Sequence, residues 1–171
     1  IRSFEVKRYS TLESLPDVEK TGYTFKCWTY DDFELNGGTR LDKTAELTTE
    51  SVNLYANYVA NNYKVTYHIQ YWDELTEQYQ YKTYTPPRNT YPETYAYGTK
   101  IDSLPDGRDK FGDLLPDFSN RLGYHFVGWT TKVMSEDDPE LGNYLYYAGQ
   151  EYAITIPSDI DFYAFFAKNT Y

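Results

Sequence analysis

The chain has 171 residues, and its 26 acidic and 16 basic residues give it a formal net charge of -10. Such a chain lacks the positive surface that holds a phosphate backbone, so we expect no binding of nucleic acid. One cysteine, Cys27, excludes an internal disulfide. No apolar run approaches the roughly 18 residues that would predict insertion into a membrane. The 21 tyrosines, 9 phenylalanines and 3 tryptophans favour strands over helices.

Alternation of apolar and polar side chains predicts the strands of the first third of the chain. In chain order these are residues 3–8, 23–30, 46–48 and 51–59. Side chains alternate between the two faces of a strand, so Tyr23 and Phe25 share one face. In a regular strand Trp28 would lie on the opposite face. We therefore expect an irregularity at Lys26–Cys27, or a strand that is covered on both faces.

The remaining two thirds of the chain predict six further strands, at residues 63–72, 77–85, 94–97, 124–132, 144–147 and 161–168. No window shows a long helical period, so helix is expected only as a turn or two at residues 109–118, with shorter turns at 10–15 and 100–104. The fold class that follows is mostly β, or α+β, with antiparallel or mixed sheets and little helix.

An aromatic block occurs twice and indicates a duplicated unit. Residues 22–28 read G-Y-T-F-K-C-W and residues 123–129 read G-Y-H-F-V-G-W. A Leu-Pro pair precedes each block, and residues 53–58 match residues 161–166 in the same order. We predict one module at residues 1–62 and a second at 63–171, with inserts at about 73–94 and 106–115 of the second. The first shows no counterpart of strand 63–72, so we expect its opening strand to be either absent or cut away. The residues expected to define the structural motif are Gly22, Tyr23, Phe25, Trp28, Gly123, Tyr124, Phe126 and Trp129.

These blocks resemble the internalin-type B repeat, also called the Listeria–Bacteroides repeat, of bacterial surface proteins. The residues that carry the resemblance are Val65-Thr66-Tyr67, Tyr97-Gly98 through Leu104-Pro105, Gly123-Tyr124 through Gly128-Trp129, and Phe162 through Phe166. Cys27 stands where the family usually has glycine, and Tyr58 and Phe166 stand where it usually has tryptophan. The resemblance implies small β-grasp-like modules, repeated along a secreted, surface-attached protein, without catalytic residues.

The sequence contains few residues in patterns typical of catalysis or metal binding. No nucleophile elbow, phosphate loop or zinc-protease motif is present. His68 and His125 are the only histidines, so we expect no metal site and no cofactor. The acidic run at residues 136–140 is an alternative calcium site, although it lacks the spacing of an EF-hand. A Lys–Asn isopeptide bond is a second open alternative.

The expected function is a non-enzymatic, monomeric spacer in the extracellular stalk of a bacterial surface protein. Because the chain begins with Ile1, we expect a piece of a longer protein. The alternative is an adhesin or ligand-binding module for a host or cell-surface protein or a glycan. Its basis is the crowding of tyrosines between residues 63 and 97, since so many large rings cannot all enter a small core. The candidate ligand-binding residues are Tyr79, Tyr81, Tyr84, Tyr91 and Tyr95.

Overall fold

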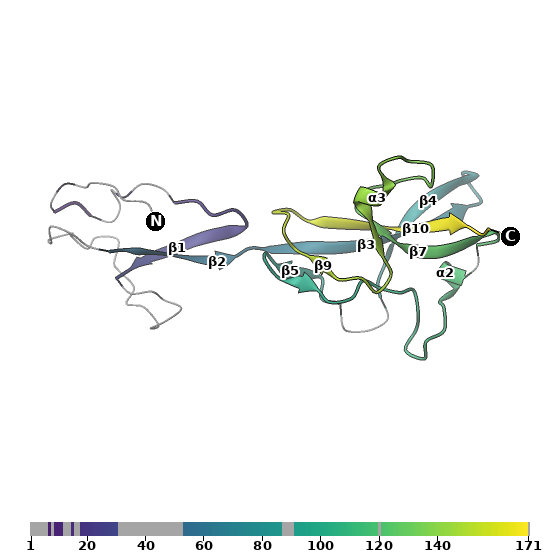
Figure 1. Cartoon of the computed structure of the whole chain (residues 1–171), viewed down its shortest axis with the longest axis horizontal. Coiled ribbons are helices and arrows are strands. Elements are labelled where there is room, and N and C mark those ends of the chain that lie inside the picture. Colours follow the sequence, from purple (N-terminus) through teal and green to yellow (C-terminus); the bar gives the residue numbers. More distant parts are fainter. Residues whose placement is uncertain are drawn as a thin grey trace. The chain divides into compact units, whose positions relative to one another are not determined.

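The structure, a computed structural model, describes residues 7, 9–11, 15, 18–30, 53–86, 91–119 and 121–170 (Figure 1). The chain divides into two compact units, Ile1–Asn61 and Asn62–Tyr171, called module 1 and module 2 below. Strands dominate the described residues of both units. The helices that the described residues form, α2 (Pro116–Ser119) and α3 (Leu141–Tyr144), are four residues long each. The expectation of a mostly β fold with little helix is therefore confirmed.

Module 1 is described around one antiparallel pair of strands, β1 (Tyr23–Thr29) and β2 (Tyr55–Ala60). The strand expected at 23–30 is thus confirmed, and the one expected at 51–59 starts later than its pattern suggested. The strands expected at 3–8 and 46–48 and the turn expected at 10–15 lie wholly or largely outside the described residues.

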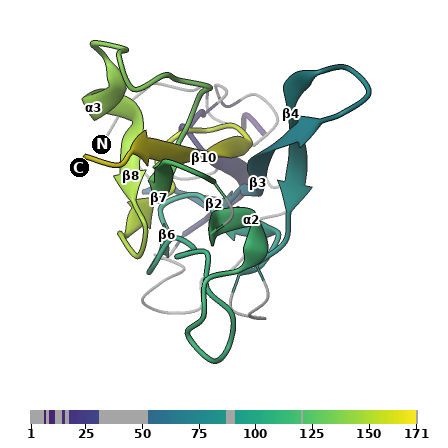
Figure 2. The same ribbon diagram turned by 90° about the vertical axis from the view of Figure 1, so that its right-hand side faces the viewer.

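Module 2 is built on a mixed sheet in the order β4-β3-β10-β7-β8, with β5 paired to the beginning of β3 (Figures 1 and 2). β3 and β4 form an antiparallel hairpin, β10 runs parallel to β3, and β7 runs antiparallel to β10. Parallel neighbours need a crossover connection, and α2 lies in that connection. A hairpin whose first strand lies parallel to the last strand gives the β-grasp-like order expected from the family resemblance. The strands are β3 (Asn62–Asp73), β4 (Gln78–Tyr84), β5 (Thr94–Ala96), β7 (Tyr124–Thr130), β8 (Leu145–Tyr147) and β10 (Ile160–Lys168).

The core of module 2 follows from the alternation along its central strands. On β3, Val65, Tyr67 and Ile69 are buried while the residues between them are not. They meet Phe162 of β10, which is fully buried. Trp129 of β7 is also fully buried, and its Nε1 donates a 2.7 Å hydrogen bond to the carbonyl oxygen of Pro105. That bond joins the Leu-Pro segment to the aromatic block, because a buried indole N–H needs an acceptor.

Two short elements correct the sequence prediction. The turn of helix expected at residues 100–104 begins instead as a strand, β6 (Lys100–Ile101), which pairs with β9 (Tyr152–Ala153). This pairing buries Ile101 and Tyr152, so tertiary contact decides the conformation of a segment too short to have a period of its own. Of the helix expected at 109–118, only α2 at the end forms. No helix in the described ranges is both long enough and apolar enough to cross a membrane.

Candidate functional site

The two aromatic blocks form the same antiparallel ladder, one in each module. β1 pairs with β2 and β7 pairs with β10 in identical register, including one irregularity at the same place. In module 1 the register passes from Phe25 directly to Cys27, and in module 2 from Phe126 directly to Gly128, so Lys26 and Val127 are the extra residues. The bulge expected from the sequence is confirmed. The equivalent pairs are Phe25–Tyr58 with Phe126–Phe166, Trp28–Ala56 with Trp129–Ala164, and Thr29–Tyr55 with Thr130–Tyr163.

The bulge explains how both rings of the block come together. One extra residue shifts the alternation of side chains, so the tryptophan returns to the face that holds the phenylalanine. The ring centroids of Phe25 and Trp28 lie 5.6 Å apart, and those of Phe126 and Trp129 lie 5.5 Å apart. The spacing of the motif is therefore a requirement of packing.

Each ladder closes with the same set of hydrogen bonds. Gly22 and Gly123 adopt φ values of 78° and 80°, a region that L side chains rarely enter. The carbonyl oxygens of these two glycines accept 2.9 Å hydrogen bonds from the backbone N–H groups of Asn61 and Asn169. The asparagine side chains repeat the likeness, because Asn61 Oδ1 lies 2.5 Å from Thr24 Oγ1 and Asn169 Oδ1 lies 2.9 Å from His125 Nδ1. The residue that follows each ladder is thus held by both its backbone and its side chain.

The tyrosines predicted to bind a ligand separate into two groups in the structure. Tyr79 and Tyr81, both on β4, have exposed fractions of 58% and 36%. Tyr84, Tyr91 and Tyr95 are half-buried and pack against the core of module 2. Burial raises the pKa of Tyr84 to about 12 and also raises the pKa of Tyr95. Of the five candidates, β4 therefore offers two to a ligand as an open surface.

A second set of side chains, not singled out by the sequence, lies beside these two tyrosines. Directly paired residues of an antiparallel hairpin share a face, and Trp72 pairs with Tyr79 while Gln70 pairs with Tyr81. The rings of Trp72 and Tyr79 lie 5.1 Å apart, and that of Tyr81 lies 5.3 Å from the ring of Tyr163 on β10. We call the surface formed by Gln70, Trp72, Tyr79, Tyr81 and Tyr163 the outer face.

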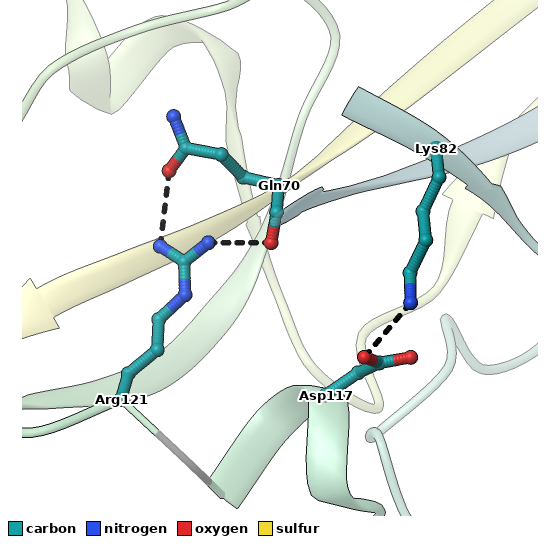
Figure 3. A network of polar contacts seen from close by, with 4 residues as sticks. All are labelled: Gln70, Lys82, Asp117 and Arg121. Atoms are coloured by element: carbon teal, nitrogen blue, oxygen red, sulfur yellow. Dashed lines mark hydrogen bonds and ion pairs between the residues drawn. The ribbon is translucent and has the colours of Figure 1, made fainter. Parts of the chain in front are cut away.

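Arg121, just before β7, contacts Gln70 of the outer face (Figure 3). Its Nη1 donates to Gln70 Oε1 at 3.0 Å and its Nη2 donates to the Gln70 carbonyl oxygen at 2.7 Å. The guanidinium carbon lies 4.0 Å from the ring centroid of Phe166 and 5.6 Å from that of Tyr79. Burial lowers the pKa of Arg121. The second polar contact of Figure 3, between Lys82 Nζ and Asp117 Oδ1 at 2.9 Å, joins β4 to α2.

The cation beside the ladder is itself part of the duplicated unit. In module 1, Lys20 holds the position of Arg121, because Tyr23 N donates to the Lys20 carbonyl as Tyr124 N donates to that of Arg121. Lys20 Nζ lies 5.6 Å from the ring of Tyr58, the counterpart of Phe166. Contact between this cation and the last aromatic residue of the ladder is therefore common to both modules. Only Arg121 has the hydrogen bonds to Gln70 on β3.

The comparison with protein families gives a match for module 1. Residues 2–57 match the Listeria-Bacteroides repeat domain. The resemblance is therefore confirmed for module 1, and the family is a repeat domain typical of bacterial surface proteins. No curated protein and no solved structure matches the chain. Module 2 resembles the matched repeat in its ladder, which has the same bulge and the same closing asparagine.

Cys27 marks where the matched repeat and module 2 differ. Its counterpart in module 2 is Gly128, where an added Cβ would lie 2.2 Å from the carbonyl oxygen of Tyr146 and 2.8 Å from the Cα of Tyr147. Glycine is therefore what lets the backbone of β8 lie so close to β7. Module 1 has a Cβ at this position, in Cys27, where module 2 has no room for one.

Sites for metal or small molecules are sparse in the described part of the chain. Within it, no group of three or more His, Cys, Asp or Glu side chains could hold a metal ion. Three carboxylates of the acidic run at 136–140 have partners: Glu140 pairs with Lys132, Asp138 Oδ1 accepts from the Glu140 N–H, and Glu136 Oε2 accepts from the backbone N–H of Lys168 on β10 at 3.3 Å. An open depression of about 380 Å³ lies beside Tyr163, lined among others by Thr131, Lys132, Ser158, Asp159 and Asp161.

Proposed function

We propose that this chain is a non-enzymatic segment of an extracellular stalk, in which successive repeats hold a distal part of a bacterial surface protein away from the cell. The family matched by module 1 supports the surface location. The observation that carries the proposal is that one ladder, with the same bulge and the same closing asparagine, is built twice.

The connection between the modules supports a spacer rather than a flexible tether. β2 ends at Ala60 and β3 begins at Asn62, so a single residue, Asn61, lies between the two strands. This joint contains neither glycine nor proline, and both the backbone and the side chain of Asn61 are hydrogen-bonded within module 1. A spacer function expects this short joint, without glycine or proline, to limit rotation of one module against the other.

Small-angle X-ray scattering of the whole chain tests the proposal. One collapsed globule of this length has a radius of gyration of about 15–16 Å, whereas two adjacent globules of these sizes give about 19 Å or more. A spacer predicts the larger value. It also predicts that replacing Asn61 with Gly-Ser-Gly-Ser broadens the distribution of distances between a label in each module. A radius near that of the collapsed globule would remove the spacer function.

A further inference from the structure

The outer face of module 2 has the composition of a binding surface and not of a solvated sheet. Tyr79 is 58% exposed, Trp72 52% and Tyr81 36%. Tryptophan, tyrosine and arginine are the residues that carry most binding energy where proteins recognise partners. All three rings belong to the hairpin β3–β4, which lies outside the ladder that the two modules share. This surface is therefore additional to the duplicated ladder.

The size of the surface decides between a protein partner and a smaller one. At about 150–250 Å² for a whole aromatic side chain, the exposed parts of the three rings sum to roughly 220–370 Å². A stable protein interface needs about 800 Å² from each partner. The three rings by themselves supply less than half of that area, so their size favours a small ligand such as a short saccharide lying on them.

The charge beside the rings identifies the group that such a ligand should carry. Arg121 donates to Gln70 with two of the five N–H groups of a guanidinium, and both bonds hold it in place. Over the described ranges, every ion pair uses a cation other than Arg121. In a chain with a net charge of -10 this is an unusual half-buried cation without a carboxylate partner. Its remaining donors suit a carboxylate, which accepts paired hydrogen bonds from arginine.

We propose that the outer face binds a saccharide that carries a carboxylate, with Arg121 holding the carboxylate and Tyr79 and Trp72 stacking on the sugar rings. The C–H faces of a pyranose ring lie against aromatic rings, and the Nε2 amide of Gln70 can donate to a hydroxyl group. Arg121 is already held by Gln70 and Phe166, so little conformational entropy is lost when the ligand arrives. This site is independent of the spacer function, because a spacer requires no ligand.

The test is a titration of the isotope-labelled full chain with two disaccharides, observed by NMR. Cellobiouronic acid carries one carboxylate and cellobiose is its neutral counterpart. We expect amide shifts around Gln70, Tyr79 and Arg121, with a Kd about tenfold lower or more for the acidic sugar. Equal affinity for cellobiose, shifts confined to other elements, or no shift at tens of millimolar sugar would overturn the proposal.

Variants locate the site within the chain. Tyr79→Ser should weaken binding of the acidic disaccharide about tenfold, since stacking on one ring is lost. Its matched control is Tyr147→Ser on β8, because Tyr147 is 61% exposed and lies two strands beyond β10. Arg121→Lys keeps the charge but not the paired donors, so it should abolish most of the preference for the acidic sugar. Equal loss in the Tyr147 variant contradicts the assignment.

Two further measurements keep the outcome unambiguous. The melting temperature of each variant shows whether module 2 is still folded, and Tyr79→Ser alone decides the matter if Arg121→Lys unfolds it. A blocked glutamyl tripeptide supplies the same carboxylate from a peptide. Binding of that peptide as tightly as the acidic sugar would show that the surface recognises carboxylates in general and would overturn the saccharide assignment.

Discussion

Replacing Gly128 with alanine tests the close approach of the β8 backbone to β7. An added Cβ would lie 2.2 Å from the carbonyl oxygen of Tyr146, inside the 3.0 Å that real Cβ atoms keep. The obstacle is backbone, so relief requires β8 to move away and weakens its pairing with β7 at residues 128–130. Overpacking of this kind costs about 1–3 kcal/mol. For a unit of this size we expect the melting temperature of module 2 to fall by about 10 °C.

The equivalent position of module 1 provides the control for this substitution. Cys27→Ala removes only a sulfur, because the Cβ is already present, so the stability of module 1 should change by less than about 1 kcal/mol. Urea denaturation measures both variants, with circular dichroism and tryptophan fluorescence as probes. Trp28 reports on module 1, and Trp72 and Trp129 report on module 2. An unchanged midpoint in the Gly128 variant, or an equal loss in the Cys27 variant, would refute the reasoning.

Three other predictions follow from burial and hydrogen bonding. Trp129→Phe should destabilise its module by about 2–4 kcal/mol, because a cavity forms and a buried hydrogen bond is lost. Trp28→Phe should destabilise module 1 by less, since Trp28 is only half-buried. Equal shifts of the unfolding midpoint in the two variants would contradict this. The pKa values of Tyr67 and Tyr84 are raised by burial, the latter to about 12. A tyrosine whose pKa is raised in the folded state stabilises the fold at pH values below its unfolded pKa near 10. This stability is lost as the pH rises toward 12, so the melting temperature of module 2 should fall across that pH range. Tyr84→Ser should lower the melting temperature of module 2 by several degrees, whereas Tyr79→Ser should leave it within about 2 °C; the reverse order would be inconsistent with their burial.

Much of the fold was accessible to sequence reasoning because it depends on local periodicity. The alternation along residues 63–72 predicted β3 with nearly correct bounds, and the conflict between the parities of Phe25 and Trp28 predicted the bulge. β6 was not accessible in this way. It has two residues, and it is a strand because β9, far along the chain at Tyr152–Ala153, pairs with it.

The candidate site was predicted only in part, for a related reason. Alternation predicts which side chains of β4 share a face. It does not predict which tyrosines outside β4 pack against the core. Tyr91 and Tyr95 follow β4, and the structure packs both against the core. Arg121 gave no local signal, because its partner Gln70 lies 51 positions earlier in the chain.

The sequence by itself determined that the chain is acidic, rich in strands and built from a repeated aromatic block, since these properties depend on composition and on spacing between near neighbours. Only the tertiary structure decided which tyrosines stay exposed, at which glycine a neighbouring strand comes close, and which residues bind the Arg121 side chain. Those outcomes depend on contacts between residues far apart in the chain, and such contacts exist only once the sheet has assembled.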